Sequence, residues 1–279
     1  MGSLRGAARD LGIDPRYDFG MTIRRSTQAD AGRGYWERMG HEDPMWAVLS
    51  DPGKEAESGG WELDDFFAGG YADVTGLRSR AEALDLAIGS GRALDFGCGV
   101  GRLTQALGQY HDEVVGIDIA ESMVTEATRL ALERNVAEVS FQVSTTAALP
   151  FADGEFDFAL TLIVLQHLSP NQGRSFIKEL IRVVMPGGAL VFQIPSHVKS
   201  PSEPETIQQK LLGLLPEPIA DKVRSARINR PGVGNHPMNG IRLGTVARII
   251  EASGATLVAA VEDSSSGDAW CSYRYFVRC

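Results

Sequence analysis

A glycine-rich turn in front of a helical pattern constrains this chain more than any other feature. The apolar run 92–96 contains Asp95 and leads into three alternating glycines, Gly97, Gly99 and Gly101. Glycine tolerates positive φ and lets a ligand approach the backbone without meeting a Cβ atom. The helix that follows presents free backbone N–H groups at its first turn. The segment therefore predicts a ligand-binding turn at the carboxyl end of a buried strand.

The pattern of the remaining chain predicts an α/β fold. Apolar runs typical of buried strands recur after the turn, and apolar residues at helical spacing separate most of them. The expected strands beyond the first are 113–118, 139–143, 156–165, 189–194, 256–262 and 272–278. The run 156–165 is continuous, as in a central parallel strand that is covered on both faces. Strands alternating with helices predict a doubly wound, mostly parallel sheet with helices on both faces.

Four segments are expected along the chain. Residues 1–90 are interpreted as an N-terminal arm, weakly patterned over 1–34, followed by a helical cap rich in aromatic residues. Residues 91–196 form the predicted core. Residues 197–242 are proline-rich and predict a lid-like insertion, because so long a segment within a compact fold is usually a binding element. Residues 243–279 supply the last helix and two strands, which complete the core.

Composition narrows the expected partners and compartment. The net charge of −9 disfavours a nucleic-acid partner, because an acidic protein repels the phosphate backbone. No apolar run is long enough to span a bilayer, and the first residues lack the apolar core of a signal peptide. The three cysteines are an odd number, which argues against a secreted disulfide framework. We therefore expect a cytoplasmic protein without a membrane partner, and the sequence does not predict its oligomeric state.

Two kinds of ligand compete for the glycine turn. A dinucleotide fingerprint, G-x-G-x-x-G, needs its third glycine at position 102, where this chain has Arg102. Asp95 lies two residues before the first glycine, and an anion there suits a ligand with a positive group better than a pyrophosphate. Asp118 ends the run 113–118 and can accept hydrogen bonds from both hydroxyls of a ribose. These features favour a positively charged nucleoside.

Four motifs resemble those of a known family, in the family's order. They are "LDFGCGVGRLT", "VVGIDIAESM", "LPFADGEFDFAL" and "VVMPGGALVFQIP", and they resemble the motifs of class I S-adenosylmethionine-dependent methyltransferases. The segment "YWERMGHEDPMWAVLSDP" resembles the N-terminal cap of bacterial small-molecule methyltransferases of this type. The resemblance implies a Rossmann-like sheet of seven strands, mostly parallel with an antiparallel C-terminal strand. It also implies S-adenosyl-L-methionine as the cofactor and a small-molecule methyl acceptor.

The resemblance also gives each motif residue a role. The glycine turn would line the methionine part of the cofactor, with Asp95 near its ammonium group, and Asp118 would hold the ribose. Ile119 and Met123 would contact the adenine, and Thr145 stands where the family often has an acidic residue. The expected cofactor-binding residues are Asp95, Gly97, Cys98, Gly99, Gly101, Asp118, Ile119, Met123, Thr145, Thr146, Leu162 and Gln166.

The chemistry of methyl transfer suggests one candidate catalytic residue. Transfer from a sulfonium is an in-line displacement, so the protein mainly aligns the nucleophile and excludes water. A hydroxyl nucleophile usually needs a general base, and His167, just after the fourth strand, is the first candidate. A purely structural role for His167 is the alternative. Trp46 and His236 are expected to contact the acceptor, and no metal site is predicted. Weaker candidates for the base are His41, Glu42, Asp43 and His236.

Three functions are weighed. The leading hypothesis is methyl transfer to oxygen or nitrogen, less readily to carbon, of a small molecule such as a secondary metabolite. The second is a nicotinamide-dependent oxidoreductase, although Arg102 and the lack of a Tyr-x-x-x-Lys pair argue against it. The third is a cofactor-binding protein without catalytic activity. Methylation of macromolecules is disfavoured, because "LQHL" stands where base-methylating enzymes carry an Asn/Asp-Pro-Pro-aromatic signature.

Overall fold

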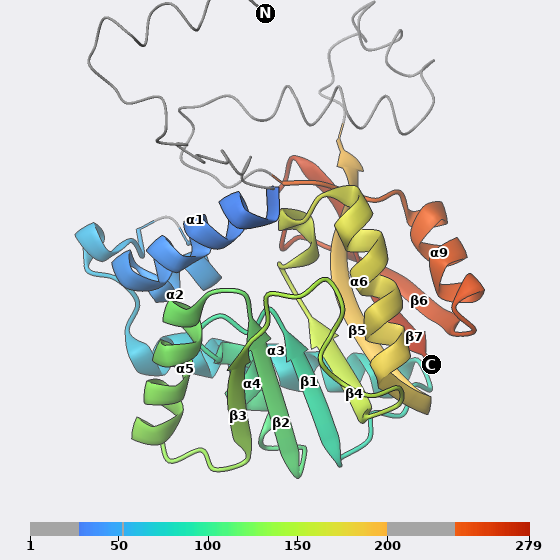
Figure 1. Cartoon of the computed structure of the whole chain (residues 1–279), viewed down its shortest axis with the longest axis horizontal. Coiled ribbons are helices and arrows are strands. Elements are labelled where there is room, and N and C mark those ends of the chain that lie inside the picture. Colours follow the sequence, from blue (N-terminus) through green and yellow to red (C-terminus); the bar gives the residue numbers. More distant parts are fainter. Residues whose placement is uncertain (1–27, 52, 200–237) are drawn as a thin grey trace, which may run out of the picture.

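The computed structural model describes residues 28–51, 53–199 and 238–279, whose strands form one seven-stranded sheet (Figure 1). The strand order is β3-β2-β1-β4-β5-β7-β6. The strands are β1 (Arg92–Phe96), β2 (Glu113–Asp118), β3 (Val139–Val143), β4 (Phe156–Thr161), β5 (Val184–Val198), β6 (Thr256–Asp263) and β7 (Trp270–Arg278). The helices are α1 (Gln28–Glu42), α2 (Pro44–Val48), α3 (Leu63–Ala83), α4 (Arg102–Leu107), α5 (Glu121–Glu133), α6 (Pro170–Val183) and α9 (Leu243–Ala252).

Parallel pairing dominates the sheet. Strand β1 pairs in parallel with β2 and β4, β2 with β3, and β4 with β5. Strand β7 runs antiparallel to both of its neighbours, β5 and β6. This arrangement confirms the predicted doubly wound sheet with an antiparallel C-terminal strand. The chain adds β2 and β3 on one side of β1 and then β4 on the other, and such a crossover is where open α/β sheets bind ligands.

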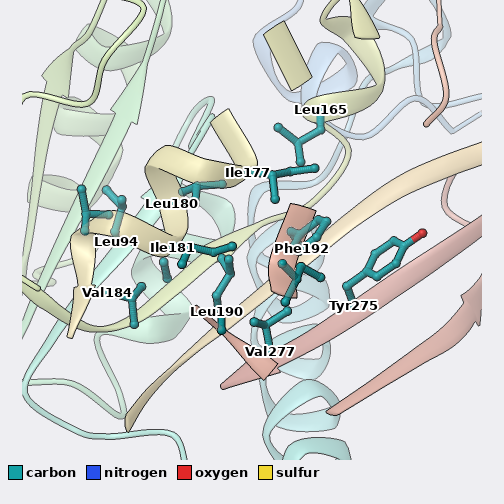
Figure 2. Close-up of a cluster of buried hydrophobic side chains, with 14 of the residues drawn as sticks. Leu94, Leu165, Ile177, Leu180, Ile181, Val184, Leu190, Phe192, Tyr275 and Val277 are labelled. Carbon is teal, nitrogen blue, oxygen red and sulfur yellow. The ribbon is translucent and has the colours of Figure 1, made fainter. Parts of the chain in front are cut away.

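Helices α6 and α9 cover one face of the sheet, where an apolar cluster fills the space between them and the strands (Figure 2). Ile177, Leu180 and Ile181 of α6 belong to this cluster, and their spacing places them on one side of the helix. The rings of Phe192 from β5 and Tyr275 from β7 stack beside them, with centroids 4.8 Å apart. The antiparallel strand is therefore fixed to the parallel part of the sheet by side-chain packing as well as by its ladder.

Helices α3 and α4 cover the opposite face. Val74, Leu77 and Ala81 of α3 pack in one cluster with Leu107 of α4 and Phe158 of β4. Helix α3 thus belongs to the helical layer of the sheet, although it lies within the segment expected to form the arm and cap. Helix α1 lies across the end of the molecule where β5 ends (Figure 1), and it contacts α5 and α2.

The fourth strand is shorter than the apolar run that predicted it. It was expected over 156–165, but β4 ends at Thr161. The apolar residues that follow line a pocket instead of extending the ladder. Ile163 has a φ of 63°, a left-handed conformation that breaks the strand. The continuous apolar run was therefore wrong as a guide to where the strand ends.

Other boundaries also differ from expectation. Strand β5 is longer than the expected 189–194, because its antiparallel pairing with β7 continues to Val198. Helix α1 begins at Gln28, inside the segment 1–34 that was expected to be a weakly ordered arm. Most of the predicted lid, 197–242, lies outside the described residues. Within the described ranges, no helix has the length and apolar character that crossing a membrane requires.

Candidate functional site

A pocket of about 750 Å³ opens at the carboxyl ends of β1, β2 and β4, beside the crossover. Its volume is typical of small-molecule sites. Its walls come from α1, α2, the glycine turn, the end of β2, the loops after β3 and β4, and the start of α6. The predicted site residues that line it are Gly97, Gly99, Asp118, Ile119, Met123, Thr145, Thr146, Leu162 and His167. Motifs that are far apart in the sequence therefore meet in one cavity.

The glycine turn has a positive φ at each glycine: 76° at Gly97, 52° at Gly99 and 84° at Gly101. A Cβ atom at Gly97 would lie 2.3 Å from the side chain of Val164, and both Gly97 and Gly99 line the pocket. Gly101 does not line it. A Cβ atom there would lie 2.8 Å from the ring of Phe141, so this glycine lets the start of α4 approach β3. Gly101 therefore serves the packing of α4, and its predicted contact with the cofactor stays a prediction.

Asp118 connects the end of β2 to the glycine turn. Its Oδ2 accepts a hydrogen bond from the N–H of Gly99 at 3.0 Å, and its Oδ1 accepts one from the N–H of Ala120 at 3.0 Å. Burial raises the pKa of Asp118, and the backbone hydrogen bonds act in the opposite direction. Each carboxylate oxygen can accept a second hydrogen bond. Because Asp118 lines the pocket, it can receive hydroxyl groups of a ligand there.

Asp95 and Cys98 were predicted to bind the cofactor, but neither lines the pocket. The Asp95 side chain is buried and accepts a hydrogen bond of 2.6 Å from the hydroxyl of Thr104. Burial raises the pKa of Asp95 to about 6. The Cys98 thiol is also buried, and burial raises its pKa well above the ordinary value, so it is not activated as a nucleophile. Both residues support the turn from within the core.

The loop after β3 carries two residues that were predicted to contact the cofactor. Thr145 and Thr146 both line the pocket. The hydroxyl of Thr146 donates a hydrogen bond of 2.6 Å to the carbonyl of Ala148 and therefore braces its own loop. Of the two residues, Thr145 is the better candidate for a polar contact with a ligand.

His167 lines the pocket from a 3₁₀ turn, Leu165–His167, that follows β4. Its ring meets the ring of Trp36 from α1 edge to face, with centroids 5.1 Å apart and an interplanar angle of 68°. Gln166, a predicted cofactor residue, is buried and does not line the pocket. Its amide Nε2 instead lies 3.4 Å from Nε2 of His167. The structure therefore places Gln166 behind the candidate base.

Three of the weaker candidates for the base, His41, Glu42 and Asp43, do not line the pocket. His41 and Glu42 each make a side-chain contact of 3.7 Å with another residue of α1. Asp43 caps α2 by accepting the N–H of Trp46 at 3.4 Å. Trp46 packs against the apolar cluster of α1, α2 and α3 and does not line the pocket, and its expected contact with the acceptor stays a prediction. His236 lies outside the described residues.

Comparison with known proteins decides what kind of site this is. Residues 94–192 match the family model described as a methyltransferase domain. These residues carry the glycine turn, Asp118 and His167, and they form the parallel centre of the sheet. Residues 94–192 are a methyltransferase domain.

Relatives with named activities are similar to part of this chain. The chloroplastic tocopherol O-methyltransferase of Arabidopsis thaliana is 31% identical over 119 residues, 42% of this chain and 34% of the relative. Norajmaline N-methyltransferase of Rauvolfia serpentina is 36% identical over 106 residues, 37% of this chain and 36% of the relative. The match with each thus spans about a third of its length.

A solved structure extends the likeness to the fold of nearly the whole chain. It is magnesium protoporphyrin IX methyltransferase from Synechocystis PCC 6803 with bound SAH, at 20% identity and a TM-score of 0.57. The superposition covers 88% of this chain and 97% of the other. At this identity the likeness concerns the fold alone.

Part of the pocket was missed by the sequence analysis. Asn171, Ser175 and Phe176, from the start of α6, line it inside the methyltransferase domain. The signal was present, because Ser169 and Gln172 form a capping box that marks where a helix begins. A helix that follows a central parallel strand begins at the carboxyl edge of the sheet, and its first turns therefore face the site.

The domain's pocket is completed by a helix that precedes it in the chain. Tyr35 and Trp36 of α1 line the pocket, and their rings contact each other edge to face at 5.0 Å. Gly32 and Arg33 of α1 and Ala47 and Val48 of α2 also line the pocket from outside residues 94–192. The described ranges contain no group of three or more His, Cys, Asp or Glu side chains that could hold a metal ion.

Proposed function

We propose that this protein transfers a methyl group from S-adenosyl-L-methionine to an oxygen or nitrogen, less readily a carbon, of a small molecule. One observation carries the proposal: Gly97 and Asp118 line the same cavity as His167 and Trp36. The first two residues belong to the motifs expected to hold the cofactor, and the last two offer a wall for an acceptor. The activities named for the relatives, on tocopherol and norajmaline, support a small-molecule acceptor.

The proposed cofactor half of the pocket is the glycine turn together with the end of β2. The cofactor supplies the methyl group and its own leaving group. Gly97 and Gly99 allow close approach to the backbone, and Asp118 would accept the ribose hydroxyls. Ile119 and Met123, which follow Asp118 and line the pocket, would contact the adenine.

The proposed acceptor half is aromatic. Trp36, His167 and Phe176 all line the pocket. Among its described lining residues, the only Lys, Arg, Asp or Glu side chains are those of Arg33 and Asp118. This supports an uncharged acceptor with a large apolar surface. It also argues against nucleic acid, whose phosphates require several basic contacts.

We propose His167 as the general base when the acceptor is a hydroxyl. A neutral imidazole would take the hydroxyl proton while the oxygen attacks the methyl carbon. Trp36 limits the orientations of the ring through its edge-to-face contact. An amine acceptor that is already neutral needs less help of this kind, so the importance of His167 depends on the atom that is methylated.

Calorimetric titration and an acceptor panel test this function. We expect S-adenosyl-L-methionine to bind with a Kd on the order of micromolar. We also expect labelled methyl groups to reach at least one phenol, alcohol or amine in the panel, and not RNA. Binding of NADH without binding of S-adenosyl-L-methionine would replace the proposal with an oxidoreductase. Cofactor binding without transfer to any acceptor would support a non-catalytic protein.

A further inference from the structure

Helix α5 begins directly after the end of β2, and its own sequence supplies no side-chain cap. The residue at its N-cap position is Ala120, where helices usually carry Ser, Thr, Asp or Asn. The N–H of Ala120 is bonded to Asp118 at 3.0 Å. The N–H groups that follow have no partner within the helix. They must therefore bond to water or to another part of the chain.

Glu37 of α1 supplies the missing acceptor. Its Oε2 accepts the N–H of Glu121 at 2.8 Å, and its Oε1 accepts the N–H of Ser122 at 3.1 Å. These hydrogen bonds are charge-assisted, and the carboxylate also meets the positive end of the helix dipole. The hydroxyl of Ser122 donates in return to the carbonyl of Glu37 at 2.9 Å. One residue of α1 is thus bonded three times to the first turn of α5.

The two helices also approach each other closely, one turn beyond Glu37. A Cβ atom at Gly40 would lie 2.2 Å from Oγ and 2.8 Å from Cβ of Ser122, so only glycine fits there without a shift. Gly34, on the same helix, is different, because a Cβ atom there would meet nothing within 4 Å. Glycine lowers the stability of a helix interior. At Gly40 that cost has a reason, which is the contact with α5.

This docking sets the position of the aromatic side chains that precede Glu37. Tyr35 and Trp36 line the pocket, whereas Glu37 does not. Residues in one turn of a helix keep a fixed geometry relative to one another. The place where Glu37 binds α5 therefore determines where the rings of Tyr35 and Trp36 lie.

We propose that Glu37 is a positioning residue, which binds the first turn of α5 and thereby holds the Tyr35–Trp36 wall against the pocket. Asp118 and Glu37 bond to successive N–H groups at the same helix N-terminus. The expected ribose-binding end of β2 and a pocket wall from outside residues 94–192 are thus fixed to one point. The role in methyl transfer rests on the proposed function, whereas the docking of α1 through Glu37 does not.

Apolar packing is the alternative account of how α1 is held. Met39 of α1 is buried in one cluster with Ala120 and Met123. If this packing were sufficient, removal of the Glu37 carboxylate would leave α1 in place. His41 also lies 3.7 Å from Glu37, but it belongs to α1 itself and does not join the helix to α5.

Hydrogen exchange measured by mass spectrometry on the protein without cofactor separates the two accounts. In Glu37→Ala the amides of α1 should exchange roughly tenfold to a hundredfold faster, because hydrogen bonds to a charged group are lost. Peptides from β1 and β4 should keep their rates. Glu37→Gln retains one acceptor oxygen and should give an intermediate rate. Glu55→Ala is the matched control, since Glu55 accepts the N–H of Gly53 at 2.8 Å within its own loop and should not affect α1.

Two glycines of α1 provide a second test that leaves Glu37 in place. Alanine raises the intrinsic stability of a helix at either position. Gly34→Ala should therefore slow exchange in α1 or leave it unchanged. Gly40→Ala should speed exchange, because the new methyl group forces α1 away from Ser122. Opposite behaviour of two identical substitutions on one helix would separate docking from helix propensity.

Steady-state kinetics with a methyl acceptor test the consequence for the site. Glu37→Ala should raise the KM of the acceptor roughly tenfold, because Trp36 is no longer held in the wall. The Kd of the cofactor should stay the same, since Asp118 keeps its hydrogen bonds from Gly99 and Ala120. Glu37→Gln should restore part of the KM, and Glu55→Ala should leave both constants unchanged.

Several outcomes would overturn the proposal. Wild-type exchange rates in α1 of a folded Glu37→Ala protein would show that apolar packing is sufficient. Faster exchange throughout the sheet would indicate general destabilisation, and faster exchange in α1 with an unchanged KM would remove the positioning role. If Glu37→Ala does not fold, Gly40→Ala and Gly34→Ala decide the matter, and equal rates in these two would overturn it. The exchange measurements need no cofactor and no acceptor, so their failure is distinct from a failure of the proposed function.

Discussion

The two edges of the sheet carry similar polar residues but use them differently. At the amino edge, Asp157 accepts the N–H of Gly91 at 2.6 Å, and Arg92 forms an ion pair with Glu113 at 3.1 Å. These groups hold chain segments together. At the carboxyl edge, Asp118 also accepts backbone N–H groups, but it lines a cavity as well. The same residue type is structural at one edge and accessible to a ligand at the other.

Two histidines show the same contrast. The side chain of His111, at the amino edge, is 0% exposed, and its ring stacks on Phe158 with centroids 5.5 Å apart. Burial lowers the pKa of His111 to about 4, so it is neutral at physiological pH. His167, at the carboxyl edge, lines the pocket. The comparison shows that access to the pocket at the carboxyl ends of the strands, and not residue type, selects the candidate functional group.

The largest effect on activity is expected when each of the two histidines is replaced in turn. His167→Gln should lower kcat with a hydroxyl acceptor roughly a hundredfold or more, because the proposed base is lost. His111→Leu should leave kcat unchanged. Steady-state rates at saturating cofactor measure both variants. Equal losses of activity in the two variants would contradict the proposed difference between the amino and carboxyl edges of the sheet.

The pH dependence of stability should also separate two buried groups. Burial raises the pKa of Asp95 to about 6, so between about pH 4 and 6 the native state keeps a proton that the unfolded chain releases. Its contribution to stability therefore falls as pH rises. His111, with a pKa of about 4, contributes in the opposite sense, because the unfolded chain holds the proton and the native state does not.

Urea unfolding across this pH range measures the two contributions. Relative to the wild type, the free energy of unfolding of Asp95→Asn should rise with pH by up to roughly 3 kcal/mol. That of His111→Leu should fall with pH relative to the wild type. Curves that run parallel to the wild-type curve would show that neither group titrates as its burial requires.

A smaller effect, on cofactor affinity, is expected when substitutions at the two ends of β2 are compared. Asp118→Ala should raise the Kd of S-adenosyl-L-methionine roughly tenfold to a hundredfold, because it removes hydrogen bonds to a charged acceptor. Glu113→Ala, at the start of the same strand, should leave the Kd unchanged. Calorimetric titration measures both, and an equal loss of affinity would indicate a general effect on the strand.

The smallest effect is expected at the amino edge itself. Arg92→Met breaks the partly exposed ion pairs with Glu113 and Glu155, and the loss of each pair should cost less than about 1 kcal/mol of unfolding free energy. It should not alter cofactor affinity. Denaturant unfolding and titration of the same protein check both points, and a weakened affinity would show that the edges are coupled.

Much of the site could be predicted because its parts are local in sequence. Gly97 and Gly99 directly follow β1, and Asp118 ends β2, so each motif marks the end of a strand. Parallel pairing of β1 with β2 then brings these ends together without further information. The same logic gave the order of strands and helices in the central sheet.

The remaining features depend on contacts between distant segments. The apolar run after Thr161 resembled more strand, but the N–H of Ile163 bonds to the side chain of Gln193, 30 residues away. Trp36 and Trp46 are both aromatic residues of the cap, yet only Trp36 lines the pocket. The packing partners of a short helix decide which of its faces turns toward the pocket. The sequence of the helix alone does not specify those partners.

A crystal structure with bound S-adenosylhomocysteine tests the central claim most directly. The account predicts that both ribose hydroxyls lie within hydrogen-bond distance of the Asp118 carboxylate and that the sulfur faces the part of the pocket lined by His167. A nucleoside bound elsewhere, or a ribose remote from Asp118, would contradict it.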